Sequence, residues 1–294
     1  GSYFPFTLYI GHEIVKHYCD YLGILDSKTW LSSEYFKTAK RLTKSIQMRK
    51  NIISLFHSNK SQPTIEEIKI NDDKLLVKKK IDGLSMIYSV KIYEEIKDCF
   101  SGLSIKNFQA HQWASAICDV CHKKRYHVKV TKKSYVQNIG FTQKECKDKI
   151  FKLLSNPKKC NNISFGYDPE FTVGEKNLNK IIYDQKENKL ILKQSIDELL
   201  KNYLENNKLN DNIFIDYIEF LNISPLDKDF YFGITIPNFN RNIITKIFLY
   251  CLEENINYDS VVFCLVDDGS DYDIMKLIKE HLNFKLKFIV IKMK

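Results

Sequence analysis

Residues 260–281 read SVVFCLVDDGSDYDIMKLIKEH, and this stretch decides the expected fold. Its first seven residues, 260–266, are almost all apolar, which is typical of a strand covered on both faces. A polar turn follows, and apolar residues then recur at helical spacing over 271–281. An apolar strand followed by an amphipathic helix indicates a parallel α/β unit.

The same pattern extends outward on both sides of this stretch. Strands are expected at 213–218, 230–236 and 284–291, and a helix at 240–254. Strands that alternate with helices of this length predict a parallel sheet. We therefore expect residues 205–294 to form an acidic, Rossmann-like, three-layer α/β domain with a short parallel sheet.

The first half of the chain has a different pattern. Apolar residues recur at helical spacing over 6–21, 32–57 and 105–117, and Gly23 would end the first of these helices. A short helical piece is expected to open at Thr64, and residues 126–135 alternate as a strand does. We therefore expect residues 1–190 to form a basic, mostly helical domain with a small β element, which makes the whole chain a mixed α/β protein.

The charge differs between the two halves. Residues 1–165 carry 29 basic and 15 acidic side chains, whereas residues 166–294 carry 16 basic and 21 acidic ones. Such asymmetry suggests two units with different electrostatic roles, and a basic unit can meet a phosphate backbone or an acidic partner. A generally lysine-rich composition is the alternative explanation, because surface lysines are usually only solvated.

Basic residues gather in two places in the first half, each close to aromatic side chains. One set recurs at helical spacing and the other surrounds the 126–135 strand: Lys37, Lys40, Arg41 and Lys44, then Lys123, Lys124, Arg125, Lys132 and Lys133. Together these two sets could track the phosphates of a nucleic acid. A solvated helix face and a solvated hairpin would give the same pattern, so both interpretations stay open.

Three short stretches resemble a known family. They are Tyr35-Phe-Lys-Thr-Ala39, Cys118-x-x-Cys121 leading into 126–135, and Phe171-Thr-Val-Gly174 followed by 179–183. Over about residues 10–185 the chain resembles a eukaryotic domain of unknown function, found near the C-termini of coiled-coil-domain, proline-rich and glutamine/serine-rich nuclear proteins. The resemblance implies a nuclear, chromatin-associated setting and no known catalytic activity.

The Cys118-x-x-Cys121 pair is a candidate metal site. Two thiolates at this spacing can bind one zinc ion from a tight turn, but a structural site needs four ligands. No second C-x-x-C or H-x-x-x-H is present to complete the set. A structural zinc site with unknown further ligands and a pair of free thiols therefore both stay open.

Carboxylates cluster after the apolar strand in the acidic half. Asp267, Asp268 and Asp271 follow that strand, and Asp216 lies in the first strand of the unit. The carboxyl ends of parallel strands face the ligand crevice in open α/β sheets, where carboxylates can hold Mg²⁺. The Phe214-Ile-Asp stretch resembles small metal-dependent ribonucleases, although helix caps and turns explain the same residues.

The cysteines indicate a cellular compartment, and the first two residues indicate that the sequence is part of a longer protein. Eight cysteines without regular spacing and without a secretory signal indicate a reducing, intracellular compartment, and no apolar run has the length of a membrane span. The opening Gly1-Ser2 resembles a remnant of a cleaved tag, so we expect a piece of a longer protein or complex.

The sequence predicts a non-catalytic nuclear protein that binds DNA, RNA or a chromatin partner through its basic half. The first alternative is a metal-dependent nuclease that uses Asp216, Asp267, Asp268 and Asp271. The second alternative is a protein–protein scaffold whose lysines are only compositional. A binder predicts one continuous basic face, a nuclease predicts converging carboxylates, and a scaffold predicts scattered lysines beside an apolar patch.

Overall fold

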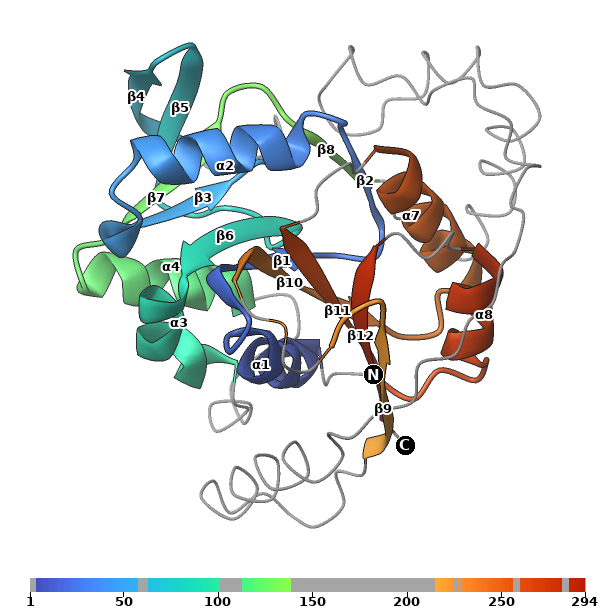
Figure 1. Cartoon of the computed structure of the whole chain (residues 1–294). Helices are drawn as coiled ribbons and strands as arrows, with labels where there is room; N and C mark the ends of the chain where they lie inside the picture. Colours follow the sequence, from blue (N-terminus) through green and yellow to red (C-terminus); the bar gives the residue numbers. More distant parts are fainter. Residues whose placement is uncertain are drawn as a thin grey trace.

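The computed structural model describes residues 4–57, 63–100, 113–138, 215–224, 227, 229–255, 260–281 and 286–293. These residues form six α-helices: α1 (Phe4–Val15), α2 (Tyr35–Ser45), α3 (Val90–Ile96), α4 (Trp113–Lys123), α7 (Asn242–Asn255) and α8 (Ile274–His281) (Figure 1). None of the helices in these described ranges is long and apolar enough to cross a membrane.

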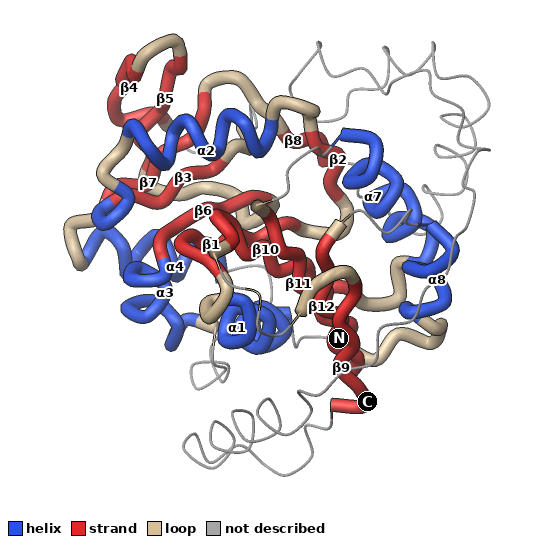
Figure 2. Tube along the Cα trace, viewed as in Figure 1, coloured by secondary structure: helices blue, strands red, loops and turns tan. Residues whose placement is uncertain are grey.

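Ten of the twelve described strands form one sheet, in the order β4-β5-β7-β3-β6-β1-β10-β11-β12-β9, and β2 pairs with β8 separately (Figure 2). Both pairing directions occur in the large sheet, so the expected mixed α/β class is confirmed. The strands are β1 (Cys19–Leu25), β2 (Thr29–Leu31), β3 (Asn51–Ser54), β4 (Thr64–Ile70), β5 (Asp73–Lys78), β6 (Ser85–Ser89), β7 (His127–Thr131), β8 (Val136–Asn138), β9 (Ile215–Leu221), β10 (Phe230–Asn238), β11 (Val261–Asp267) and β12 (Lys287–Met293).

The C-terminal elements follow the expected pattern closely. Strands β10, β11 and β12 are parallel, and β11 is buried along its whole length, as its apolar sequence predicts. Strand β9 differs, because it joins the edge of β12 in the antiparallel direction. The first strand of the unit therefore lies at the margin of the sheet and outside its parallel part.

The described residues of the N-terminal half form eight strands, so the prediction of a mostly helical unit is wrong. Helix α1 ends at Val15, and Gly23 lies inside β1, where a Cβ would come within 2.5 Å of the Ile234 side chain. The expected 32–57 helix is α2 followed by β3, and Thr64 opens β4. The buried strand β3 is apolar on both faces, which periodicity alone does not distinguish from a helix.

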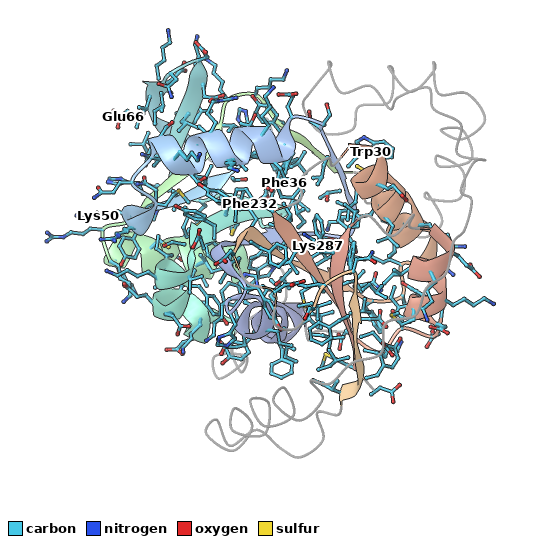
Figure 3. The ribbon with its side chains drawn as sticks, viewed as in Figure 1. Trp30, Phe36, Lys50, Glu66, Phe232 and Lys287 are labelled. Carbon is cyan, nitrogen blue, oxygen red and sulfur yellow. The ribbon has the colours of Figure 1, made fainter. Side chains whose placement is uncertain are left out.

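Two apolar cores lie on the two faces of the sheet. Helices α2, α7 and α8 contribute to one core, and helices α1, α3 and α4 contribute to the other. Along β11 the side chains alternate between them, with Phe263 in the first core and Cys264 in the second. In the first core Phe36 of α2 meets Phe232 of β10, with ring centroids 5.8 Å apart (Figure 3).

The two halves of the chain share this sheet. Strand β1 pairs with β10 in parallel, from Cys19 opposite Phe230 to Ile24 opposite Thr235. Helix α1 lies in the same core as the inner faces of β10 and β11. The expected boundary at 190–205 and the 171–183 part of the family resemblance lie outside the described residues. Strands from either side of that boundary nevertheless belong to one sheet, in contrast to the two separate units that we expected.

Candidate functional site

Helix α2 carries the first set of basic residues on its solvent side. Its apolar residues face the first core because they recur every three or four positions. Lys37 and Lys44 are exposed, and Lys37 lies 3.2 Å from Glu34. The ammonium of Lys40 lies over the Tyr231 ring, 5.2 Å from its centroid. The α2 set therefore forms one basic row, as its spacing predicts.

Arg41 is bound to its own chain. Its Nε and Nη2 donate to the two carboxylate oxygens of Asp73 on β5, each at 2.8 Å, and this partner raises the pKa of the guanidinium. A bidentate pair of this kind fixes the side chain geometrically. Arg41 thus fastens α2 to the sheet, and it offers less of its charge to an external phosphate than Lys37 or Lys44.

Two further exposed basic residues follow α2, and the sequence analysis did not assign them to the binding set. Arg49 and Lys50 follow in a short 3₁₀ helix, and both are exposed. Lys44, Arg49 and Lys50 form no ion pair with another described residue. The signal was present in the sequence, but the expected 32–57 helix would have placed these residues on unrelated faces.

The second basic set divides between two locations. Lys123 is the last residue of α4, Lys124 and Arg125 follow it, and Lys124 pairs with Glu95 at 3.2 Å. Lys132 and Lys133 lie in the turn after β7, where Lys132 pairs with Glu67 at 2.9 Å and Lys133 lies over the Tyr135 ring.

The basic residues do not form one face. Helix α2 packs on the first core and helix α4 on the second, so their charged sides lie on opposite sides of the sheet (Figure 1). A nucleic acid that follows the α2 row therefore cannot also lie on the end of α4 without passing around the sheet edge.

Cys118 and Cys121 lie in α4, which continues through the pair. We expected a turn there, and this difference places the two thiols one helical turn apart on the buried face. Burial raises the pKa of the Cys118 thiol to about 11 and that of Cys121 to about 12. Zinc binds the thiolate form, so a zinc ion at this pair would displace a proton from each buried thiol. Within the described ranges, no group of three or more His, Cys, Asp or Glu side chains is placed to hold a metal ion.

A row of polar side chains crosses the carboxyl ends of the parallel strands. Asn238 of β10 is in register with Asp267 of β11, and Asp267 with Lys292 of β12. Lys292 is in turn opposite Tyr217 of β9. Parallel and antiparallel neighbours in register share a face, so all four side chains lie on the α7 and α8 side.

Asp267 is the centre of this row and is fully buried. Lys292 Nζ donates to Oδ2 at 2.6 Å, and Asn238 Nδ2 donates to Oδ1 at 2.6 Å. The backbone N–H of Ser270 donates to Oδ2 and its hydroxyl to Oδ1. Four donors satisfy the carboxylate, so it is a structural centre that ties three strands and the following turn together.

The other three predicted acids do not converge on Asp267. Asp268 is the first residue after β11, and burial together with the charge of Asp267 raises its pKa to about 6. Asp271 is exposed and accepts from Asn240 Nδ2 at 3.0 Å. Asp216 is exposed on β9. Its side chain lies on the other face of the sheet from that of Tyr217, which is the residue opposite Lys292.

A second ion pair at the same end of the sheet was not predicted. Asp26 follows β1 and is 5% exposed. Arg241, at the start of α7, donates to its Oδ1 at 2.8 Å, and Lys28 Nζ lies 3.3 Å from its Oδ2. The sequence held no usable signal for this site, because the first helix was expected to reach residue 21 and to end at Gly23, and no strand was expected before Asp26.

Comparison with known proteins adds no relative: no family model, no curated protein and no solved structure matches this chain.

Proposed function

We propose that the protein binds a nucleic acid without catalysing a reaction, through the basic row of α2 and the segment that follows it. The observation that carries the proposal is the exposure of Lys44, Arg49 and Lys50 without ion-pair partners in the described residues. Lysines and arginines that are not neutralised within the chain can release counterions from a phosphate backbone, which drives such binding.

The aromatic residues beside this row support the proposal. Lys40 lies over Tyr231, and Tyr231 lies beside Tyr21 with ring centroids 4.9 Å apart. Partly exposed tyrosines among lysines suit a single-stranded nucleic acid, whose bases stack on aromatic rings. The family resemblance supports a nuclear, chromatin-associated setting, and zinc at Cys118 and Cys121 is a separate and weaker proposal.

The layer arrangement of the C-terminal half is a separate proposal. We propose that the C-terminal strands and their helices form a three-layer α/β unit, because α7 and α8 contribute to one core and α1 to the other. The parallel strands would then position the structural Asp267 network, while α2 presents the binding surface above the first core.

Fluorescence anisotropy with labelled single-stranded RNA and duplex DNA across a salt series tests the binding proposal. The logarithm of the binding constant should fall linearly with the logarithm of the salt concentration. A Lys44→Ala/Arg49→Ala/Lys50→Ala variant should reduce that slope by about 0.7–0.9 for each phosphate that the variant no longer neutralises.

A matched control is available on the opposite face of the sheet. A Lys123→Ala/Lys124→Ala/Arg125→Ala variant removes the same number of charges from the end of α4. The proposal expects this control to keep a larger salt slope than the α2-side variant. Equal losses would indicate only a general charge effect, and no binding at low salt would favour the scaffold alternative.

A further inference from the structure

Strand β4 is the last strand at one end of the large sheet. Among the described strands it pairs with β5 alone, and the β4–β5 hairpin stands at the outer margin of the described part of the molecule (Figure 1). Its residues are mostly exposed, and Ile65 at 58% is one of only two exposed large apolar side chains among the described residues. An open edge of this kind can pair with another strand.

The regular part of this edge is short and well defined. The pairing of β4 with β5 shifts register between Thr64 and Glu66, so the regular ladder runs from Glu66 to Ile70. These five residues contain no proline, which would have blocked pairing. Glu66, Ile68 and Ile70 face the first core side, and Glu67 and Lys69 face the other side.

Lys69 has an unfavourable neighbour within its own chain. It lies directly opposite Lys74 of β5, and like charges in this position destabilise a sheet. Neither lysine has an ion-pair partner among the described residues. An acidic residue on the open side of β4 would therefore be a favourable neighbour for Lys69.

A second copy of the same strand supplies such a residue, Glu67, whose carboxylate pairs with Lys132 of its own chain at 2.9 Å and would be shared between the two lysines. When a two-fold axis perpendicular to the sheet relates two antiparallel copies, each side chain stays on the same face of the joined sheet. Even-numbered residues of one copy therefore lie opposite even-numbered residues of the other, and odd-numbered residues opposite odd-numbered ones. With the axis at Ile68, the middle of the ladder, Ile68 faces Ile68 of the other copy and Glu67 faces its Lys69. The symmetry repeats the Glu67–Lys69 pair, and all five ladder residues gain an opposite residue.

We propose that the β4 edge is a homodimer interface, in which two copies pair in antiparallel fashion about Ile68 and join their sheets into one. In this register Glu67 and Lys69 lie opposite each other on one face of the sheet. On the other face, Ile68 lies opposite Ile68 of the second copy. Shifting the axis to Glu67 would instead place Glu67 opposite its own copy, so the charges select the Ile68 register. This inference does not depend on the proposed function.

Sedimentation analysis of charge-reversed variants tests the interface. Wild-type protein should form a concentration-dependent dimer with twice the mass of one chain. Lys69→Glu places glutamates opposite each other twice, and Glu67→Lys does the same with lysines, so each variant should dimerise on the order of tenfold more weakly. Glu67→Lys also removes the Glu67–Lys132 pair within the chain, so Lys132→Ala, which removes that pair and leaves the β4 charges unchanged, is its control.

Two complementary samples identify the register. The double variant Glu67→Lys/Lys69→Glu reverses both charges and should dimerise as the wild type does. An equimolar mixture of the two single variants should also form dimers, because every lysine then faces a glutamate. Lys69→Glu also replaces the Lys69–Lys74 like-charge pair by an attractive one, so an unchanged or higher melting temperature would separate lost dimerisation from misfolding.

The outcomes that overturn the proposal are equally definite. A wild-type chain that stays monomeric at the highest concentration reached would exclude the interface. A dimer that Lys69→Glu leaves intact would place the interface elsewhere. Single variants that fail to dimerise when mixed, together with a double variant that stays monomeric, would reject the Glu67–Lys69 pairing.

Discussion

Lys292 on β12 holds the buried carboxylate of Asp267 on β11 through an ion pair of 2.6 Å. The two residues are opposite each other in the parallel ladder, and Asp267 has no exposed surface. A buried charge depends on its partner much more than a surface charge does, since water cannot replace that partner. The pair is therefore a point at which stability can be tested directly.

Lys292→Met should destabilise the protein by about 3 kcal/mol or more, because it leaves a buried carboxylate without its counter-charge. Urea denaturation followed by circular dichroism measures the change. The double variant Asp267→Asn/Lys292→Met removes both charges and should recover a large part of the loss. If the single and double variants are equally unstable, the loss comes from packing and the ion pair is not its cause.

His12 predicts loss of stability in acid. Its ring nitrogens share hydrogen bonds with the hydroxyls of Thr235 and Tyr88, at 2.7 and 2.6 Å, and burial lowers its pKa to about 3. Between the unfolded pKa of about 6.5 and the folded value, only the unfolded state takes up the proton. Stability from this residue is therefore complete above pH 6.5 and falls by about 1.4 kcal/mol per pH unit below it.

Chemical denaturation at pH 7.0, 5.5 and 4.5 checks this expectation. A His12→Gln variant has no titrating group at this position and should have a flatter pH dependence, even though its stability at neutral pH is lower. Identical slopes for the variant and the wild type over this range would contradict the assignment of the acid sensitivity to His12.

Asp268 predicts the opposite pH dependence. Burial, and then the charge of Asp267, raise its pKa to about 6, so the folded state holds the proton more tightly than the unfolded state does. Stability from this residue is therefore present below the unfolded value of about 3.8 and falls as the pH rises to about 6. Because the carboxyl is partly solvated, the expected cost above pH 6 is on the order of 1 kcal/mol.

Asp268→Asn should remove this cost, and its stability should exceed that of the wild type at pH 7.5 but not at pH 3.5. Asp271→Asn is the matched control, because Asp271 is an exposed acid three residues further along the same turn. A similar gain in the control would mean that a general reduction of negative charge explains the effect.

Gly11 of α1 lies so close to β10 that a larger side chain at this position should not fit. A Cβ at this position would overlap with Thr235 Cγ2 and would lie 2.8 Å from Thr235 Oγ1. Gly11→Ala should therefore cost about 1–3 kcal/mol of stability, even though alanine favours a helix over glycine. Thermal denaturation measures the loss. Thr235→Ser removes the obstructing methyl and keeps the hydroxyl for His12, so the double variant should recover part of the lost stability, while Oγ1 still lies 2.8 Å from the added Cβ. A stable single variant would disprove the close approach.

Part of the fold was predictable because local patterns specified it. The apolar run of β11 and the amphipathic α8 could be located from periodicity, and the structure confirms both. The exposed basic side of α2 was predicted for the same reason. In contrast, β3 and the first three residues of β1 were expected as helix, because a buried strand has apolar residues on both faces and loses the alternation that identifies it.

The same distinction between local and long-range information applies to the candidate sites. The sequence by itself determined which residues are basic, acidic or apolar, and which helix faces and parallel strands they occupy, because these properties repeat at short range. Only the tertiary structure decided that Arg41 pairs with Asp73, that the basic row of α2 and the basic end of α4 lie on opposite faces, and that Lys292 neutralises Asp267. Those relationships depend on strand order and register, which join residues far apart in the chain and leave no periodic trace in the sequence.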